Sequence, residues 1–286
     1  MILKTTNNSR RAFFTTLSVL TIALQGFTVC GAEAASKKKQ EKAPAVSAKT
    51  EDLVEAGVRD LSFKKTAEAL ENFDKAIKEN PNYALSYGNR ANAYIALGKY
   101  KEAIADCDKA ISLDPSLPIA YVNRSWAYNL TRQYQKSVAD CDKAISLAPN
   151  MVIAYTNRSH AYNKLGKHKE ALEDCNKVIG INKEFAPAYV NRAHTYIGMG
   201  EFNKAVADCD TAIKLKGDYT KAYLNRGHAY RELGELDKAL ADLDKAISQH
   251  DGLGAAYYNR SKVYQMKAAK DMEKAKKFGF LQKDAD

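Results

Sequence analysis

Two residue types that can bind metals or do redox chemistry recur along this chain at a fixed spacing. Cysteine occurs five times, and four of the five stand 34 residues apart: Cys107, Cys141, Cys175 and Cys209. Three histidines keep the same spacing: His160, His194 and His228. Thiolate and imidazole are the usual ligands of zinc, and two thiols can form a disulfide. What these residues can do depends on the elements that hold them.

The spacing of 34 residues belongs to the whole segment around these residues. An Asn-Arg pair that follows an aromatic residue returns without an insertion at 89–90, 123–124, 157–158, 191–192, 225–226 and 259–260. A period of this length is typical of stacked supersecondary units. In the copy at 84–117, Tyr87 and Tyr94 mark one face of a first helix. Gly98 breaks that helix and Pro115 ends a second one. Such a hairpin cannot bury its apolar faces alone, so each must stack on the next.

This stacking separates equivalent cysteines too far for joint chemistry. Equivalent positions of stacked hairpins lie about one helix spacing apart, roughly 8–10 Å. A disulfide needs Cα atoms within about 7 Å, and a zinc ligand lies about 2.3 Å from the metal. Leu243 and Phe73 fill the cysteine position in the neighbouring copies, which marks it as core. We therefore expect buried thiols, no disulfide, no metal and no cofactor. The same spacing excludes a metal shared by the histidines.

Carboxylates flank the core cysteines, as Asp106 and Asp108 flank Cys107. Residues i and i+2 of a helix do not face one another, so these pairs do not suit general acid–base catalysis. The first aspartate recurs with the repeated arginine in the five copies from Asp106 to Asp242. Hairpin geometry brings Arg90 near Asp106, which predicts an Arg–carboxylate pair in each copy. No Ser-His-Asp or Cys-His combination is supported, so we expect no catalytic residues and no enzymatic activity.

Taken together, these residues resemble the tetratricopeptide repeat family over about 50–286. With Ala84 as position 1, positions 4 and 11 are Tyr, position 8 is small, and positions 20 and 27 are mostly Ala. A degenerate copy precedes them, and the last copy, from Gly254, lacks the turn glycine. The resemblance implies an all-α, right-handed superhelical solenoid of stacked helix-turn-helix hairpins. The expected copies are 50–83, 84–117, 118–151, 152–185, 186–219, 220–253 and a partial 254–286.

The resemblance also implies a groove that holds an extended peptide along the first helices. In the family, asparagine at position 6 lies on this concave face and commonly bonds a peptide backbone, and position 9 lies on it as well. Two alternatives stay open: asparagines that bond their own scaffold, and solvated histidines. Groove-facing histidines would make binding depend on pH near neutrality. The expected groove residues are Asn89, Asn123, Asn157, Asn191, Asn225, Asn259, Trp126, His160, His194, His228 and Lys221.

One activity of the family finds little support. Chaperone-binding members hold a carboxylate with lysine at position 2 and asparagine at position 6, continued in the following copies. Only Lys221 with Asn225 and then Asn259 fits this pattern, and the third copy that it needs is missing. We expect no chaperone binding.

The first 35 residues have the composition of an export signal. Lys4, Arg10 and Arg11 precede an uncharged run from Ala12 to Ala32, and Ala-Glu-Ala at 32–34 is a typical cleavage motif. The adjacent arginines also resemble a twin-arginine signal. An uncleaved membrane anchor is a further alternative, because the run of 21 residues just reaches the length of a membrane span. Each alternative predicts a periplasmic or cell-envelope location.

Residues 36–49 show no apolar periodicity and are predicted to form a disordered basic linker, able to touch an anionic membrane surface. Of the net charge of +10, +6 lies in residues 1–49, which hold eight Lys or Arg and two Glu. The repeats keep 36 basic and 32 acidic residues, interspersed, so no nucleic-acid partner is expected.

The sequence thus predicts a non-enzymatic scaffold that binds a peptide or protein segment outside the cytoplasm. The alternatives are a membrane-tethered component of cell-envelope assembly and a non-catalytic subunit of an enzyme complex. The partner's identity, the export route and the oligomeric state are left open by the sequence.

Overall fold

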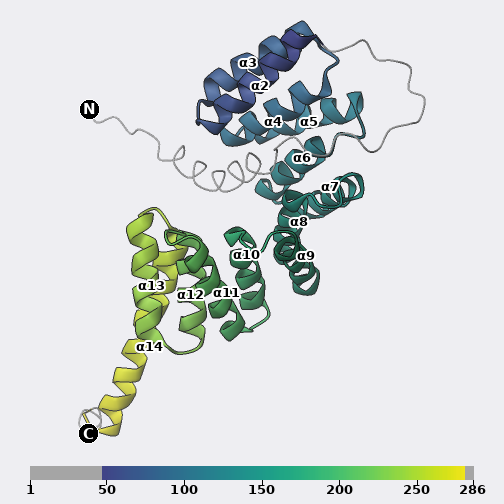
Figure 1. Cartoon of the computed structure of the whole chain (residues 1–286). Helices are drawn as coiled ribbons and strands as arrows, with labels where there is room; N and C mark the ends of the chain where they lie inside the picture. Colours follow the sequence, from purple (N-terminus) through teal and green to yellow (C-terminus); the bar gives the residue numbers. More distant parts are fainter. Residues whose placement is uncertain (1–46, 281–286) are drawn as a thin grey trace, which may run out of the picture. The chain divides into compact units, whose positions relative to one another are not determined.

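The computed structural model describes residues 47–280, which form thirteen α-helices and no strand (Figure 1). Helices follow one another in pairs, a first helix of 13 residues and a second of 14 in the regular copies. They are α2 (Ala48–Ser62), α3 (Thr66–Glu79), α4 (Ala84–Ala96), α5 (Tyr100–Leu113), α6 (Pro118–Leu130), α7 (Tyr134–Leu147), α8 (Val152–Lys164), α9 (His168–Ile181), α10 (Ala186–Gly198), α11 (Phe202–Leu215), α12 (Thr220–Glu232), α13 (Leu236–Gln249) and α14 (Gly254–Lys277).

The turns and ends of the helices lie where the sequence predicts them. Gly98 ends the first helix of its copy at a φ of 75°, a left-handed conformation that glycine adopts without steric cost. Arg132 takes the same place in the next copy at a φ of 61°, which L side chains rarely adopt. The second helix α5 ends at Leu113, two residues before Pro115.

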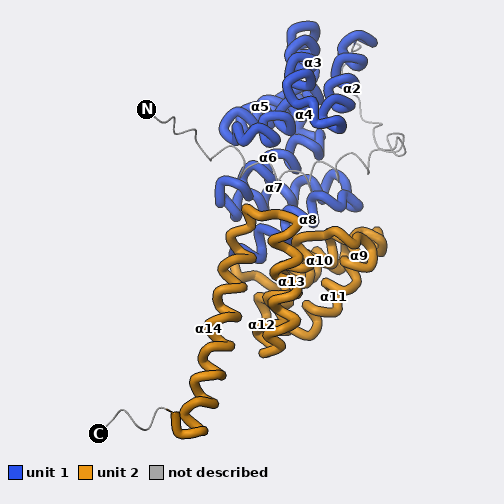
Figure 2. The backbone as a smooth tube through the Cα atoms, turned by 90° about the vertical axis from the view of Figure 1, so that its left-hand side faces the viewer, with its two compact units in different colours: residues 1–165 blue, residues 166–286 orange. Residues whose placement is uncertain are grey.

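The chain divides into two compact units, residues 1–165 and 166–286 (Figure 2). Among the described residues, the first unit holds α2 to α8 and the second holds α9 to α14. Within each unit, hairpins pack on their sequence neighbours. Ala91, Cys107 and Ala127, for example, belong to one buried cluster that joins the copy at 84–117 to the next. The all-α stack of helix-turn-helix repeats predicted from the sequence is confirmed.

The two ends of the described chain differ from a regular copy. The helix α2 begins at Ala48, where the Ser47 side chain accepts a hydrogen bond from the backbone N–H of Thr50. Residues 47–49 therefore belong to the cap and first turn of α2, and not to a linker. The rest of the predicted linker and the predicted export signal lie outside the described residues. None of the described helices combines the length and the apolarity that a membrane span requires.

Candidate functional site

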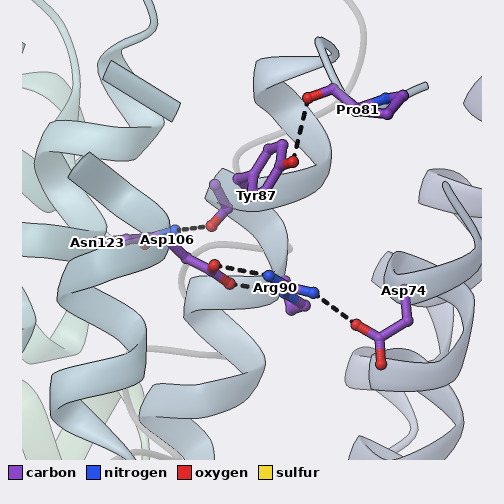
Figure 3. Close-up of polar contacts among 7 residues, drawn as sticks. Asp74, Pro81, Tyr87, Arg90, Asp106 and Asn123 are labelled. Carbon is purple, nitrogen blue, oxygen red and sulfur yellow. Dashed lines mark hydrogen bonds and ion pairs between the residues drawn. The ribbon is translucent and has the colours of Figure 1, made fainter. Parts of the chain in front are cut away.

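The repeated arginine is held between two helices by three hydrogen bonds. Arg90 donates from Nε and Nη2 to the two carboxylate oxygens of Asp106, at 2.7 and 2.8 Å (Figure 3). Its Nη1 donates to Asp74 of the preceding copy at 2.7 Å. The first pair confirms the predicted Arg–carboxylate contact within a hairpin. The second ties one hairpin to the preceding one, and the sequence analysis did not assign it.

The same arrangement returns in later copies. In each, the arginine binds an aspartate of its own second helix and a polar residue of the preceding second helix. The contacts join Arg124 to Asp140 and Asp108, Arg192 to Asp208 and Asn176, and Arg226 to Asp242 and Asp210. The second aspartate of each flanking pair therefore has a structural partner in the next copy. A sequence signal existed, because this aspartate keeps the same 34-residue spacing.

Two tyrosines enclose the arginine. The Arg90 guanidinium carbon lies 5.6 Å from the ring centroids of both Tyr87 and Tyr94, within cation–π range. The Tyr87 hydroxyl donates to the carbonyl of Pro81 at 3.1 Å, which fixes the turn that enters the copy (Figure 3). Hydrogen bonding to Asp106 raises the pKa of Arg90 further above its usual value. The carboxylates and arginines at these positions thus hold the repeats together.

The four repeated cysteines are buried, as predicted. Burial raises the pKa of the Cys141 thiol to about 12 and that of Cys107 well above its ordinary value. Thiols of this kind are unreactive because the thiolate is the nucleophile and the metal ligand. Within the described part of the chain, no group of three or more His, Cys, Asp or Glu residues is arranged to hold a metal ion.

Five of the six asparagines at position 6 donate to the protein's own carbonyls. The Asn123 amide donates to the carbonyl of Gly88, one first helix earlier, at 2.9 Å. Asn157 donates to the carbonyl of Val122 at 3.2 Å and to the Ser125 hydroxyl at 3.0 Å. Since the Asn157 side chain belongs to a residue only 1% exposed, it has almost no surface to offer a ligand.

The other members of this row differ in their partners. Asn225 donates to the preceding first helix, at the Val190 carbonyl, whereas Asn89 and Asn259 donate to carbonyls four residues back in their own helices. Asn191 is half-buried. Ligand contact by this row stays a prediction, and the observed contacts correspond to the scaffold alternative.

The remaining predicted groove residues lie on first helices, within the two units. In the first unit, Trp126 and His160 meet edge to face, with ring centroids 5.9 Å apart. In the second unit, His194 and Lys221 are exposed and His228 is half-buried. Burial lowers the pKa of His228, so its imidazole carries little charge at neutral pH.

A hollow on the first helices of the second unit brings several side chains together. It has a volume of about 400 Å³ and lies between α12 and α14. Arg231, within the hollow, donates to the Asn259 side-chain oxygen at 2.5 Å and pairs with Glu232. Of the lining residues, Lys262 stands at position 9 and Arg231 stands beside the asparagine row, both on the face that the resemblance assigns to the groove; the others were not expected there. The lining residues are Arg231, Glu232, Tyr258, Lys262, Gln265, Met266 and Ala269.

Comparison with known proteins gives one family. The family models described as tetratricopeptide repeat match residues 84–117, 119–151, 152–185, 186–219 and 220–250, more than half of the chain. No curated protein matches it. Among solved structures, YrrB, described as a TPR protein with an unusual peptide-binding site, is 25% identical at a TM-score of 0.50. The match covers 66% of this chain and 97% of YrrB.

Two further structures show the shared fold alone. A tetratricopeptide repeat protein from Parabacteroides merdae is 22% identical at a TM-score of 0.62, over 82% of this chain and 94% of that one. PilW, described as a type IV pilus biogenesis factor, is 18% identical at a TM-score of 0.66, over 74% of this chain and 98% of that one. The repeats matched by the family models are the hairpins described above, and the chain therefore belongs to the tetratricopeptide repeat family.

Proposed function

We propose that this chain is a non-enzymatic scaffold that binds an extended segment of another protein along its first helices. Tetratricopeptide repeats are protein–protein interaction modules, and this general role follows from the family. The proposal adds a place for the ligand, the hollow between α12 and α14. The peptide-binding site of YrrB supports a peptide as the ligand class.

The hollow carries the proposal because it combines apolar surface with both signs of charge. Tyr258 is 61% exposed and Met266 is 37% exposed, so both offer apolar area to a ligand. Lys262 and Arg231 add donors, and Glu232 adds an acceptor. Mixed surfaces of this kind suit a peptide, whose backbone presents donors and acceptors and whose side chains fill apolar space.

The hydrogen bonds between consecutive first helices contribute to the proposed peptide binding. The amides of Asn123, Asn157 and Asn225 lock consecutive first helices at fixed spacing, within their units. A surface that is rigid before binding loses little conformational entropy when the ligand arrives, so the cost of ordering falls on the peptide. These residues then support binding by holding the groove and not by touching the ligand.

The test selects ligands and asks where they bind. Peptides that bind the full chain are selected from a library of random extended peptides, and the affinity of each selected peptide is measured by fluorescence anisotropy. Lys262→Glu in the hollow is compared with Lys245→Glu, which makes the same charge change at an exposed position of α13. We expect a loss of about tenfold or more for Lys262→Glu, or roughly 1.4 kcal/mol, and little change for Lys245→Glu.

Either of two outcomes would overturn the proposal. One is a selection that yields no peptide with saturable binding. The other is an equal loss of affinity in both variants, which would show that binding depends on overall charge. Circular dichroism of each variant checks that the fold is intact.

We also propose that the protein is exported, on the strength of the basic start, apolar run and Ala-Glu-Ala motif of residues 1–35. Fractionation of cells that express the full chain, with N-terminal sequencing of the product, tests this. We expect a product in the envelope fraction that begins near residue 35. A product in the cytoplasm that keeps residue 1 would contradict export. A product in the membrane fraction that keeps its N-terminal segment would instead favour a membrane-tethered assembly component.

A further inference from the structure

The last copy forms one long helix where every other complete copy forms a hairpin. The helix α14 runs for 24 residues, from Gly254 to Lys277, and extends past the other helices of its unit (Figure 2). Ala268 stands where Gly98 breaks the helix in a regular copy, and it remains helical. The face of α14 that corresponds to a hairpin interface therefore has no second helix from these residues.

The intact hairpins show what normally covers this face. A Cβ built on Gly227, at position 8 of α12, would lie 2.9 Å from Cγ of Leu243 in α13. Position 8 is also buried in each of the other intact copies. Tyr87, at position 4, is only 9% exposed and shares a cluster with Ala110 of its own second helix. Tyr94, at position 11, packs against the buried cluster that holds Cys107 of α5. Positions 4, 8 and 11 of a first helix are thus the contact face for a second helix.

On α14 the same three positions are open. Tyr257 is 41% exposed and Tyr264 is 54% exposed, and Ser261 between them is exposed as well. These residues lie about 100° around the helix from Tyr258 and Lys262, which line the hollow, because each residue of an α-helix advances by 100°. The open face is therefore distinct from the groove.

The arginine of this copy has an incomplete set of contacts. Arg260 binds Asp244 of the preceding second helix at 2.6 Å, and its side chain is 30% exposed. In intact hairpins, such as that of Arg226, two further donors bind a carboxylate of the same copy's second helix. In the last copy the corresponding position, 276, is a lysine within α14 itself. Arg260 thus presents donors for a carboxylate that the described residues of its own copy do not provide.

The charge of α14 indicates the kind of occupant. The helix carries seven Lys or Arg residues and two acidic ones. Two copies of this helix would repel one another, and the basic residues of the N-terminal segment would be repelled as well. An acidic helix would be attracted.

We propose that the open face of α14 binds a helix of a partner protein, which completes the last hairpin from outside the chain. The partner helix is amphipathic and acidic. Counting from a first small residue at position i, it has an aspartate at i+3, an apolar residue at i+4 and a second small residue at i+7. The aspartate reaches Arg260, and the small residues allow close approach to Tyr257, Ser261 and Tyr264. The spacing is that of the chain's own second helices, such as Ala239, Asp242, Leu243 and Ala246 in α13.

The experiment uses the sequence of α13 as a probe. A fluorescent peptide of residues 236–249 is held helical by a link between the side chains at 241 and 245, both exposed in α13. Its binding to the full chain is measured by anisotropy. We expect saturable binding that weakens about tenfold with Arg260→Ala, the size expected for loss of a charge-assisted bidentate contact. Ser261→Tyr, which fills the notch between the two tyrosines, should abolish binding. Lys274→Ala removes one positive charge elsewhere on α14 and should have little effect.

A peptide in which the aspartate at 242 is replaced by asparagine should lose the same tenfold and be insensitive to Arg260→Ala. No saturable binding, or equal losses from Arg260→Ala and Lys274→Ala, would overturn the proposal. So would dimerisation of the chain alone that Ser261→Tyr abolishes, since a second copy would then occupy the face. Failure here leaves the groove proposal standing, because Lys262→Glu tests a different side of the helix.

Discussion

The arginine that joins two hairpins offers the sharpest test of what holds the repeats together. Arg124→Ala removes two bonds to Asp140, at 2.7 and 2.8 Å, and one to Asp108 at 2.6 Å. It also removes the guanidinium from the faces of Tyr121 and Tyr128, 5.8 and 5.9 Å away. Asp140 is then left without its partner, and its side chain is only 9% exposed.

The expected cost is about 3 kcal/mol. Breaking a buried ion pair by removing one partner costs about 3–5 kcal/mol, and the Arg124 side chain is 19% exposed, which places the cost at the low end. Arg260→Ala is the matched control, because this arginine occupies the same position in its copy. Its partner Asp244 is 53% exposed, so its loss should cost about 1 kcal/mol or less.

The cost should also depend on pH. Burial raises the pKa of Asp140, and Arg124 acts in the opposite direction, so Arg124→Ala raises that pKa further. A carboxyl whose pKa is higher in the folded state than in the unfolded state destabilises the fold where it is ionised in both. That penalty disappears as the pH falls through the folded-state pKa. Arg124→Ala should therefore be more destabilising at pH 7 than near pH 4.

Urea unfolding followed by circular dichroism gives the total effect, and hydrogen exchange of α6 and α7 locates it. Local resolution is needed because repeat arrays do not always unfold in one step. In the double variant Arg124→Ala/Asp140→Asn, the buried charge is gone, so part of the stability should return. A cost no greater than that of Arg260→Ala, or one that is the same at both pH values, would refute the assignment of Arg124–Asp140 as a buried ion pair.

Three further experiments test the packing of the repeats. Asn157→Ala should lower the free energy of unfolding by about 1 kcal/mol or more, since it removes two buried hydrogen bonds, to the Val122 carbonyl and the Ser125 hydroxyl. Asn89→Ala removes a bond within one helix and should cost clearly less in the same urea titration. Gly227→Ala should cost about 1–3 kcal/mol through overpacking against the second helix, whereas Gly180→Ala, with no atom within 4 Å of the added carbon, should stabilise by roughly 0.5–1 kcal/mol. Because burial raises the pKa of Cys141 to about 12, its thiol should resist alkylation at pH 8 until urea unfolds the chain, and mass spectrometry of the labelled peptide reads this directly.

The hairpins could be predicted because each rests on a pattern within one copy. The tyrosines, the turn glycine and the arginine recur at spacings that define helix faces, and helix phase alone brings Arg90 to Asp106. The angular positions around the helix also place Asp106 and Asp108 on different sides, but they do not predict that Asp108 reaches the arginine of the next copy. That contact depends on how one hairpin packs on another, which a single copy does not encode.

The asparagine row shows the same limit more clearly. Position 6 lies at the edge between the groove face and the face that packs on the preceding first helix. A side chain as short as asparagine can turn either way from there, and helix phase does not decide between them. In the structure Asn123 and Asn157 turn toward the preceding first helix, where the carbonyls of Gly88 and Val122 accept their amides. Their regular spacing therefore marks a repeated position, while the partner of each amide depends on how closely the neighbouring first helix approaches.

The same dependence on neighbours makes the end of the stack informative. A terminal helix needs only a polar outer face to stay soluble, and the lysines of α14 meet that need. They do not explain why two tyrosines and an arginine stand together on the face that a second helix covers in the other copies. Exposed tyrosine area contributes to stability only when something covers it, and a guanidinium with free donors is best satisfied by a carboxylate. Both properties describe an interface that lacks one of its halves, which is why an acidic helix is a better account of this face than a solubilising cap.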